Sequence, residues 1–186
     1  KVSEFRRSEF VGPTISSELL MKGLQAVLFA LAAILIYIWL RFEWQFGFGA
    51  VVALAHDVLF TLGVLSIFGV EFSLSTVAAI LTIAGYSIND SVVIFDRIRE
   101  NLRKYKKLDL VDVFNESINN TLSRTLMTSI TTLIALFSLF IFGGEVIKPF
   151  AFAMIIGIVI GTYSSIYIAV PTLLLFKFRP QDEDSN

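Results

Sequence analysis

The sequence contains no cysteine, a single histidine and few charged residues. Only 17% of its 186 residues are charged and 55% are hydrophobic, whereas a soluble domain carries charge at about a quarter of its positions. The missing cysteines exclude disulfide frameworks, thiolate nucleophiles and zinc–thiolate sites. With a net charge of −1, the chain has no excess of basic residues for binding nucleic acid. We expect no metal, no cofactor and no nucleic-acid partner, and the mean hydropathy of +0.76 indicates a membrane protein.

Long hydrophobic runs are abundant. A helix that crosses a lipid bilayer needs about 20 mostly apolar residues. Five stretches meet this requirement, approximately 19–40, 46–69, 73–95, 125–142 and 150–176. Inside them only Lys22, Asp57 and Asp90 are charged, and Lys22 lies near an end where its long side chain can reach the interface. The sequence therefore predicts an all-α membrane protein with a five-helix transmembrane domain at 19–176.

The basic residues predict the orientation, because Lys and Arg accumulate on the cytoplasmic side of membrane proteins. The connection at 96–124 carries seven of them, and it shares a side with Arg41 and the tail at 177–186. We expect these segments to be cytoplasmic and residues 1–18 to be the end of a periplasmic segment. No signal peptide precedes the first apolar run, so we expect an earlier helix and interpret the sequence as the C-terminal part of a longer protein.

The expected cytoplasmic loop at 96–124 has a helical pattern of its own. Leu110, Val113 and Phe114 recur at helical spacing after Asp109, a residue type that often caps helices. Two interpretations of this segment are open. The segment is either an amphipathic helix at the membrane interface or a solvated connector that packs on the helix ends.

Two predicted spans contain acidic residues at depth. Asp57, next to His56, lies near the middle of the second span, and Asn89-Asp90 lies in the third. A charged carboxylate at such depth costs roughly 3 kcal/mol, so it is a functional hypothesis by default. Burial favours the neutral form of a carboxyl and a nearby cation favours the charged form. Such a group can load and release a proton as its access alternates.

The residues that precede Asp90 suggest a contact face. Tyr86 and Ser87 lie four and three residues before it, and Gly85 lies four residues before Asn89. Hydroxyl groups beside a small residue are typical of close helix contacts. We therefore expect this face to be covered by another helix and not by lipid.

The fourth span begins with many hydroxyl side chains. Residues 121, 125, 128 and 132, all threonines, fall on one helix face, with Arg124 among them. Either these hydroxyls bond to their own backbone carbonyls, or they form a polar seam for protons or water beside Asp90. In the fifth span, Gly157 and Gly161 predict close helix packing, and Pro171 predicts a kink or an end.

Two motifs in the third span and its exit carry a resemblance to a known family. Gly85-Tyr86-Ser87-Ile88-Asn89-Asp90 and Phe95-Asp96-Arg97-Ile98-Arg99-Glu100-Asn101 resemble the signature of the SecF family of protein-export membrane subunits, part of the resistance-nodulation-division superfamily. Further matches extend the resemblance over nearly the whole chain: Val11-Gly12-Pro13, Arg41-Phe42-Glu43, His56-Asp57, Thr61-Leu62-Gly63, Arg124-Thr125, Gly143-Gly144 and Gly161-Thr162-Tyr163-Ser164-Ser165. The sister subunit SecD would carry an Asp-Ala-Asn type sequence instead. The family's first helix and most of its periplasmic domain have no counterpart here.

The resemblance implies a multi-pass protein of the bacterial inner membrane that works with SecD, YajC, the SecYEG channel and YidC. It implies that the complex uses the proton-motive force to promote export of preproteins. By the same resemblance, Asp90 is the proton-responsive carboxylate, Asn89 orients it, and Arg99 and Arg124 are candidates for the charge that modulates it. The supporting polar residues are His56, Asp57, Tyr86 and Thr128.

Two other functions are alternatives to protein export. A proton-coupled small-molecule permease of the same superfamily would use the same carboxylate, but it would normally have about twelve spans in one chain. An intramembrane aspartyl protease would need a Gly-x-Gly-Asp motif, which Asp90 lacks, and His56 has no nucleophile motif for hydrolase chemistry. We therefore predict that the chain is not an enzyme.

Overall fold

The computed structural model describes residues 13–176. The expected periplasmic end before residue 13 and the expected cytoplasmic tail at 177–186 lie outside the described residues. Within the described part, five helices are long and apolar enough to cross a membrane. The prediction of an all-α membrane protein with five transmembrane helices is confirmed.

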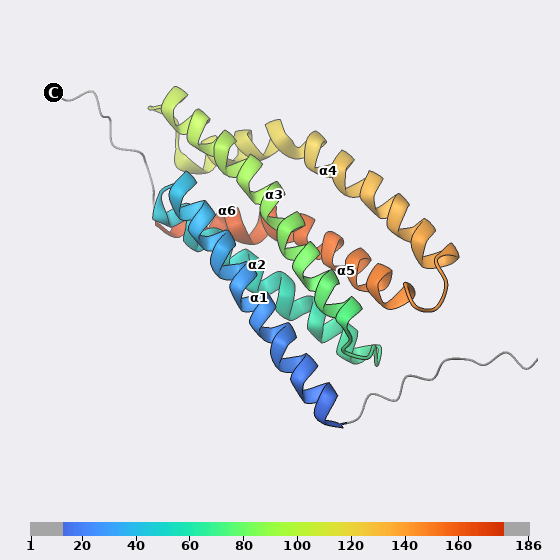
Figure 1. Cartoon of the computed structure of the whole chain (residues 1–186). Helices are drawn as coiled ribbons and strands as arrows, with labels where there is room; N and C mark the ends of the chain where they lie inside the picture. The colour runs from blue at the N-terminus through green and yellow to red at the C-terminus, as the bar shows by residue number, and fades with distance from the viewer. Residues whose placement is uncertain (1–12, 177–186) are drawn as a thin grey trace, which may run out of the picture.

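The helices form a single bundle (Figure 1). They are α1 (Pro13–Arg41), α2 (Trp44–Ile67), α3 (Leu74–Lys104), α4 (Leu110–Phe142), α5 (Lys148–Ser164), the π-helical segment η1 (Ser165–Ala169) and α6 (Val170–Leu175). Helix α3 contacts α1, α2, α4 and α5 and is therefore the central element. The α1–α2 turn, the α3–α4 connection and the end of α6 lie at one end of the bundle, and the other two turns lie at the opposite end (Figure 1).

Local sequence signals determine where several helices begin and end. Gly69 and Gly144 have positive φ angles of 65° and 76° in the turns after α2 and α4, a conformation that glycine adopts without steric cost. Ser73 caps α3 in a reciprocal capping box with Thr76. The Asp109 carboxylate accepts a hydrogen bond from the Val111 backbone N–H, which confirms the cap expected there.

The connection between the third and fourth spans is much shorter than expected. Helix α3 continues to Lys104 and α4 already begins at Leu110, so most of the segment at 96–124 is helical. The helix expected after Asp109 exists, but it is continuous with the fourth span. The reason is packing between the two helix ends, where Ile98 and Phe114 are buried in one apolar cluster and the Asn101 side-chain amide donates to the Ser117 hydroxyl at 2.9 Å.

The fifth span is interrupted near its C-terminal end, close to Pro171, where the sequence predicts a kink or an end. The α-helix gives way to the π-helical segment η1, and Pro171 lies in the first turn of α6 directly after it. Proline has no backbone N–H and its ring clashes with the preceding turn, and a π-helical turn is one way to accommodate such a disruption.

The core consists of two apolar clusters with a polar layer between them. One cluster lies toward the α1–α2 turn and contains Phe42, Phe46 and Phe95, with ring centroids 5.3–6.2 Å apart. The other lies toward the opposite end and includes Ile83 and Ile158. Along α2, α3, α4 and the fifth span, a set of buried polar residues falls between these clusters: Asp57, Thr61, Ser87, Asp90, Ser91, Thr125, Ser129, Ser164 and Ser165.

The two glycines of α5 are packing residues, as predicted. A Cβ atom added at Gly157 would overlap the Ile83 side chain of α3, and one added at Gly161 would lie 3.3 Å from the Ser87 Cβ. These contacts bring the backbones of α3 and α5 close together. Gly85 behaves differently: it is exposed, as is Asn89, and no atom lies within 4 Å of a Cβ added there. The expectation that this face is covered by another helix holds for Tyr86 and Ser87, which contact α4 and α2. It is wrong for Gly85 and Asn89 in the described chain, because the neighbouring helices pack on the side of α3 that carries Ser87 and Asp90.

Candidate functional site

Asp57 is the most completely buried acidic residue of the polar layer, with 0% exposure. Its Oδ2 accepts hydrogen bonds from the hydroxyl of Ser87 on α3 at 2.5 Å and from the hydroxyl of Ser164 on α5 at 2.7 Å. Its Oδ1 lies 3.1 Å from the Nδ1 of His56, whose side chain is one-third exposed. The carboxylate thus joins three helices through hydrogen bonds that offset the cost of its burial.

Asp90 is also buried, with 3% exposure, but its surroundings differ. Its Oδ2 has no hydrogen-bond partner within the described part of the chain. An acceptor that is buried and unpaired is energetically costly, and native structures leave few of them. Asp90 is therefore the acidic residue of the polar layer that has a carboxyl oxygen without a described hydrogen-bond donor.

The two arginine candidates have different surroundings. Arg124 lies on α4, which packs against α3, and is near enough to Asp90 to act on it electrostatically. Arg99 lies nine residues beyond Asp90 on α3, which is about 13 Å along a helix. Its guanidinium is paired instead with Glu43 at 3.2 Å, an interaction that the sequence did not reveal. Asn89 is exposed, and the described structure brings it into no hydrogen bond with Asp90.

The threonine face of α4 consists mainly of hydroxyls bonded to their own helix. Thr121, Thr128 and Thr132 donate to carbonyl oxygens three or four residues earlier, and Thr125 is buried with no partner in the part of the chain that is described. Local backbone bonding therefore accounts for three of the four positions, Thr128 included. It leaves Thr125 as the unpaired hydroxyl of this face.

A short chain of hydroxyls connects three helices at a neighbouring position. The Tyr86 hydroxyl on α3 donates to Ser129 on α4 at 3.5 Å, and Ser129 lies 2.7 Å from the hydroxyl of Thr162 on α5. Thr162 in turn donates to the Ile158 carbonyl. Sequence spacing placed Tyr86 on the face of Asp90, but Ser129 and Thr162 come together only through the packing of α4 on α5.

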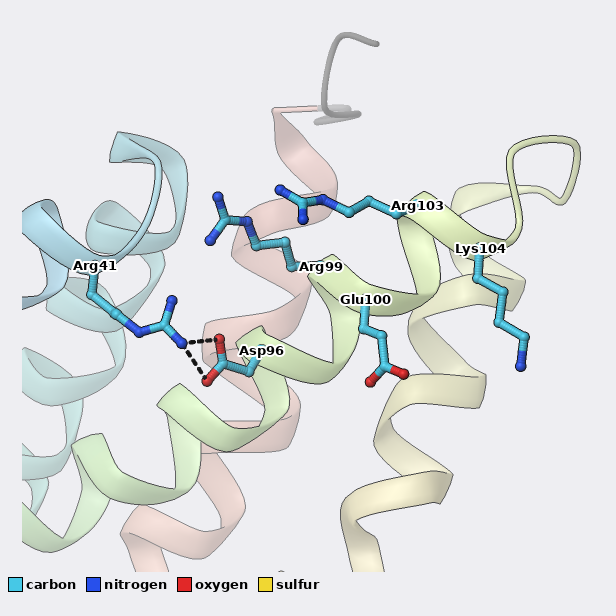
Figure 2. A pocket seen from close by; sticks show the side chains of 6 residues that line it. All are labelled: Arg41, Asp96, Arg99, Glu100, Arg103 and Lys104. Atoms are coloured by element: carbon cyan, nitrogen blue, oxygen red, sulfur yellow. Dashed lines mark hydrogen bonds and ion pairs between the residues drawn. The ribbon is translucent and has the colours of Figure 1, made fainter. Parts of the chain in front are cut away.

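The C-terminal turns of α3 line a cleft of about 540 Å³ at the end of the bundle where the basic residues gather (Figure 2). One nitrogen of Arg41 lies 3.1 Å and 3.3 Å from the two oxygens of Asp96. Glu100, which lines the cleft, is paired with Arg97 at 2.7 Å. These ion pairs are partly exposed and contribute little to stability. Among the described residues there is no group of three or more metal-ligating side chains.

The chain matches the protein family described as protein export membrane protein SecD/SecF, C-terminal, over residues 1–179. It is 55% identical over 176 residues to the protein translocase subunit SecF of Rickettsia rickettsii, covering 95% of this chain and 57% of that protein. It is 61% identical over 165 residues to the protein translocase subunit SecF of Cereibacter sphaeroides, covering 89% of this chain and 51% of that protein. The chain thus spans about half the length of the curated relatives that it matches.

Solved structures show the same arrangement of helices. The crystal structure of SecDF, a translocon-associated membrane protein from Thermus thermophilus, matches with a TM-score of 0.85 and 49% identity, over 90% of this chain and 23% of that one. A structure of SecDF in a super-membrane-facing form matches with a TM-score of 0.79 and 47% identity, over 90% of this chain and 22% of that one. The resemblance inferred from the motifs around Asp90 and Asp96 is confirmed, and the chain belongs to the SecD/SecF family of protein export membrane proteins.

Proposed function

We propose that this chain is the membrane part of a SecF subunit that works with SecD and uses the proton-motive force to promote preprotein export across the bacterial inner membrane. Its relatives are protein translocase subunits, and its structural neighbours are SecDF proteins. These similarities do not support the alternative of a small-molecule permease. The proposal includes YajC, the SecYEG channel and YidC as further partners.

The observation that carries the coupling proposal is the buried, incompletely paired carboxyl of Asp90 opposite the Arg124 charge. When Asp90 is charged, its attraction to Arg124 favours close approach of α3 and α4. When a proton binds, that attraction is lost and the two helices are free to separate. Moving one charge through 100 mV releases roughly 2.3 kcal/mol, which changes a conformational equilibrium by more than tenfold.

The proposed orientation places the basic end of the bundle in the cytoplasm. Within the described residues this end carries Arg41 at the end of α1, and the last turns of α3 and the α3–α4 connection add Arg97, Arg99, Arg103, Lys104, Lys106 and Lys107. At the opposite end, Lys148 is paired with Glu145 at 2.6 Å. An excess of Lys and Arg is typical of the cytoplasmic side of multi-pass membrane proteins. Residues 1–18 then lie toward the periplasm, and the tail at 177–186 lies in the cytoplasm.

The first test uses inner-membrane vesicles that contain SecD and the full-length protein. We expect Asp90→Asn to insert and to bind SecD normally, but to lose the stimulation of preprotein translocation that an uncoupler abolishes in the parent. Asp112→Asn makes the same chemical change at an exposed position of α4 and should respond to the uncoupler like the parent. If Asp90→Asn keeps its full uncoupler-sensitive stimulation, another carboxylate carries the coupling and the assignment to Asp90 is wrong.

A further inference from the structure

The cleft at the exit of α3 contains more positive than negative charge. Six charged side chains line it: Arg41, Asp96, Arg99, Glu100, Arg103 and Lys104. Both lining carboxylates already have cationic partners, Asp96 in Arg41 and Glu100 in Arg97. Arg103 is exposed and forms no ion pair with a described residue. The cleft therefore keeps at least one cationic side chain that no acidic residue of the described chain neutralises.

Three guanidinium groups face the same space. Figure 2 shows the side chains of Arg99 and Arg103 extending from α3 toward Arg41 of α1, whereas Lys104 extends to the opposite side of α3. Arg99 is only partly satisfied by Glu43, because its Nε is buried and has no hydrogen-bond partner among the described residues. Planar guanidinium groups with free N–H donors match the oxygens of a phosphate group.

The position of the cleft indicates which phosphate compound can reach it. The cleft lies at the end of the membrane-spanning helices, beside the α1–α2 turn. Trp39 and Trp44 flank that turn and are 69% and 54% exposed, and exposed tryptophans are enriched where a helix meets the lipid head groups. A phosphate at the level of Arg41 is therefore at the depth of the phospholipid head groups.

We propose that Arg41, Arg99 and Arg103 form a binding site for the phosphate of an anionic phospholipid head group. Basic pockets between helices at the cytoplasmic surface are suited to such lipids. Asp96 and Glu43 hold two of the arginines in place, and Arg103 supplies the charge in excess. The site is separate from the polar layer, so it can be tested independently of proton coupling.

The test measures lipid retention by the full-length protein in complex with SecD. The complex is first reconstituted in nanodiscs of phosphatidylcholine with a minority of phosphatidylglycerol. It is then extracted into detergent, and the lipid molecules that remain bound are counted by native mass spectrometry. The parent should retain phosphatidylglycerol in preference to phosphatidylcholine. Arg103→Gln should reduce the retained phosphatidylglycerol about fivefold, the effect of one basic side chain near an anionic surface.

Lys107→Gln is the matched control, because it removes one positive charge from an exposed residue of the α3–α4 connection, four positions further along the chain. Lys107 is not among the residues that line the cleft. This variant should retain phosphatidylglycerol like the parent. An equal loss in both variants, or none in Arg103→Gln, would show that the cleft is not a specific site and would overturn the proposal.

A second arm distinguishes a lipid from a soluble ligand. Nanodiscs of phosphatidylcholine alone are incubated with inorganic phosphate, and bound phosphate is measured for the parent and for Arg103→Gln. We expect no retention that depends on Arg103. Retention of inorganic phosphate by the parent alone, without a preference for phosphatidylglycerol, would assign the cleft to a soluble phosphate and refute the lipid site.

Discussion

At the scale of single residues, the two buried aspartates have the same chemistry and different surroundings. Asp57 is bonded to two hydroxyl donors and approaches His56, so its position is held by three helices. Asp90 has an oxygen without a partner in the described chain and an arginine that acts on it electrostatically. A fully paired carboxylate favours one structure, whereas an incompletely paired one can gain a partner. We therefore propose a structural role for Asp57 and the coupling role for Asp90.

The structural role of Asp57 predicts the effect of removing one donor. Ser164→Ala should lower the free energy of unfolding by about 1–2 kcal/mol, because Oδ2 of a buried carboxylate then loses one of two hydroxyl donors. Unfolding of the purified full-length protein can be followed by titration with sodium dodecyl sulfate. Ser138→Ala is the control, since that exposed hydroxyl donates only to the Ile134 carbonyl of its own helix. Equal stabilities of Ser164→Ala and Ser138→Ala would contradict this role.

At the scale of elements, the close approach of α3 and α5 determines the geometry of the polar layer. Gly157 and Gly161 allow Ile83 and Ser87 to pack against the α5 backbone, and Ser87 then reaches Asp57 on α2. In a membrane, where lipid is as apolar as the side chains, such close backbone packing is a main source of helix association. The glycines thus position a polar network to which they contribute no side chain.

This packing predicts that a single methyl group on α5 is destabilising. Gly157→Ala should lower the free energy of unfolding by about 1–3 kcal/mol, because the new Cβ overlaps Ile83 and forces α3 away from α5. Gly63→Ala makes the same change on α2, where no atom lies within 4 Å of the added Cβ. It should be neutral or stabilising, since alanine favours helices more than glycine. The prediction fails if the two variants unfold at the same detergent concentration.

At the scale of the whole molecule, one face of the central helix is left uncovered. Ala78, Thr82, Gly85 and Asn89 follow each other at helical spacing along α3 and are all exposed. Small and polar residues exposed on a membrane-spanning helix are suited to contact with another helix. We propose that SecD packs on this face, which would bring its helices beside Asn89, next to Asp90.

This proposal predicts the effect of a bulky side chain at the centre of the face. Gly85→Leu should leave the fold of this chain intact, because no described atom lies within 4 Å of the added Cβ. It should reduce recovery of SecD about fivefold or more, since overpacking of a helix contact costs about 1–3 kcal/mol. Co-purification from detergent-solubilised membranes measures this. Gly63→Leu introduces the same bulk on α2 and should recover SecD normally. Undiminished recovery with Gly85→Leu would place the SecD contact elsewhere.

The sequence by itself determined the fold class, the number of spans and the presence of two acidic residues at depth. These properties depend on composition and on spacing within one helix, and hydropathy and the cost of buried charge can be evaluated residue by residue. Capping at Asp109 and the interruption at Pro171 were predictable for the same reason. Even the close packing at Gly157 followed from a local pattern.

Only the tertiary structure decided which polar groups meet. Ser164 and Asp57 are 107 residues apart and are joined at 2.7 Å, while Arg99 bonds to Glu43 and leaves Arg124 to act on Asp90. The same packing exposes Gly85, which helical spacing had assigned to a covered face. Spacing along a helix defines which residues share a face, but the direction of that face depends on how several helices pack together, and that information is distributed over the whole chain.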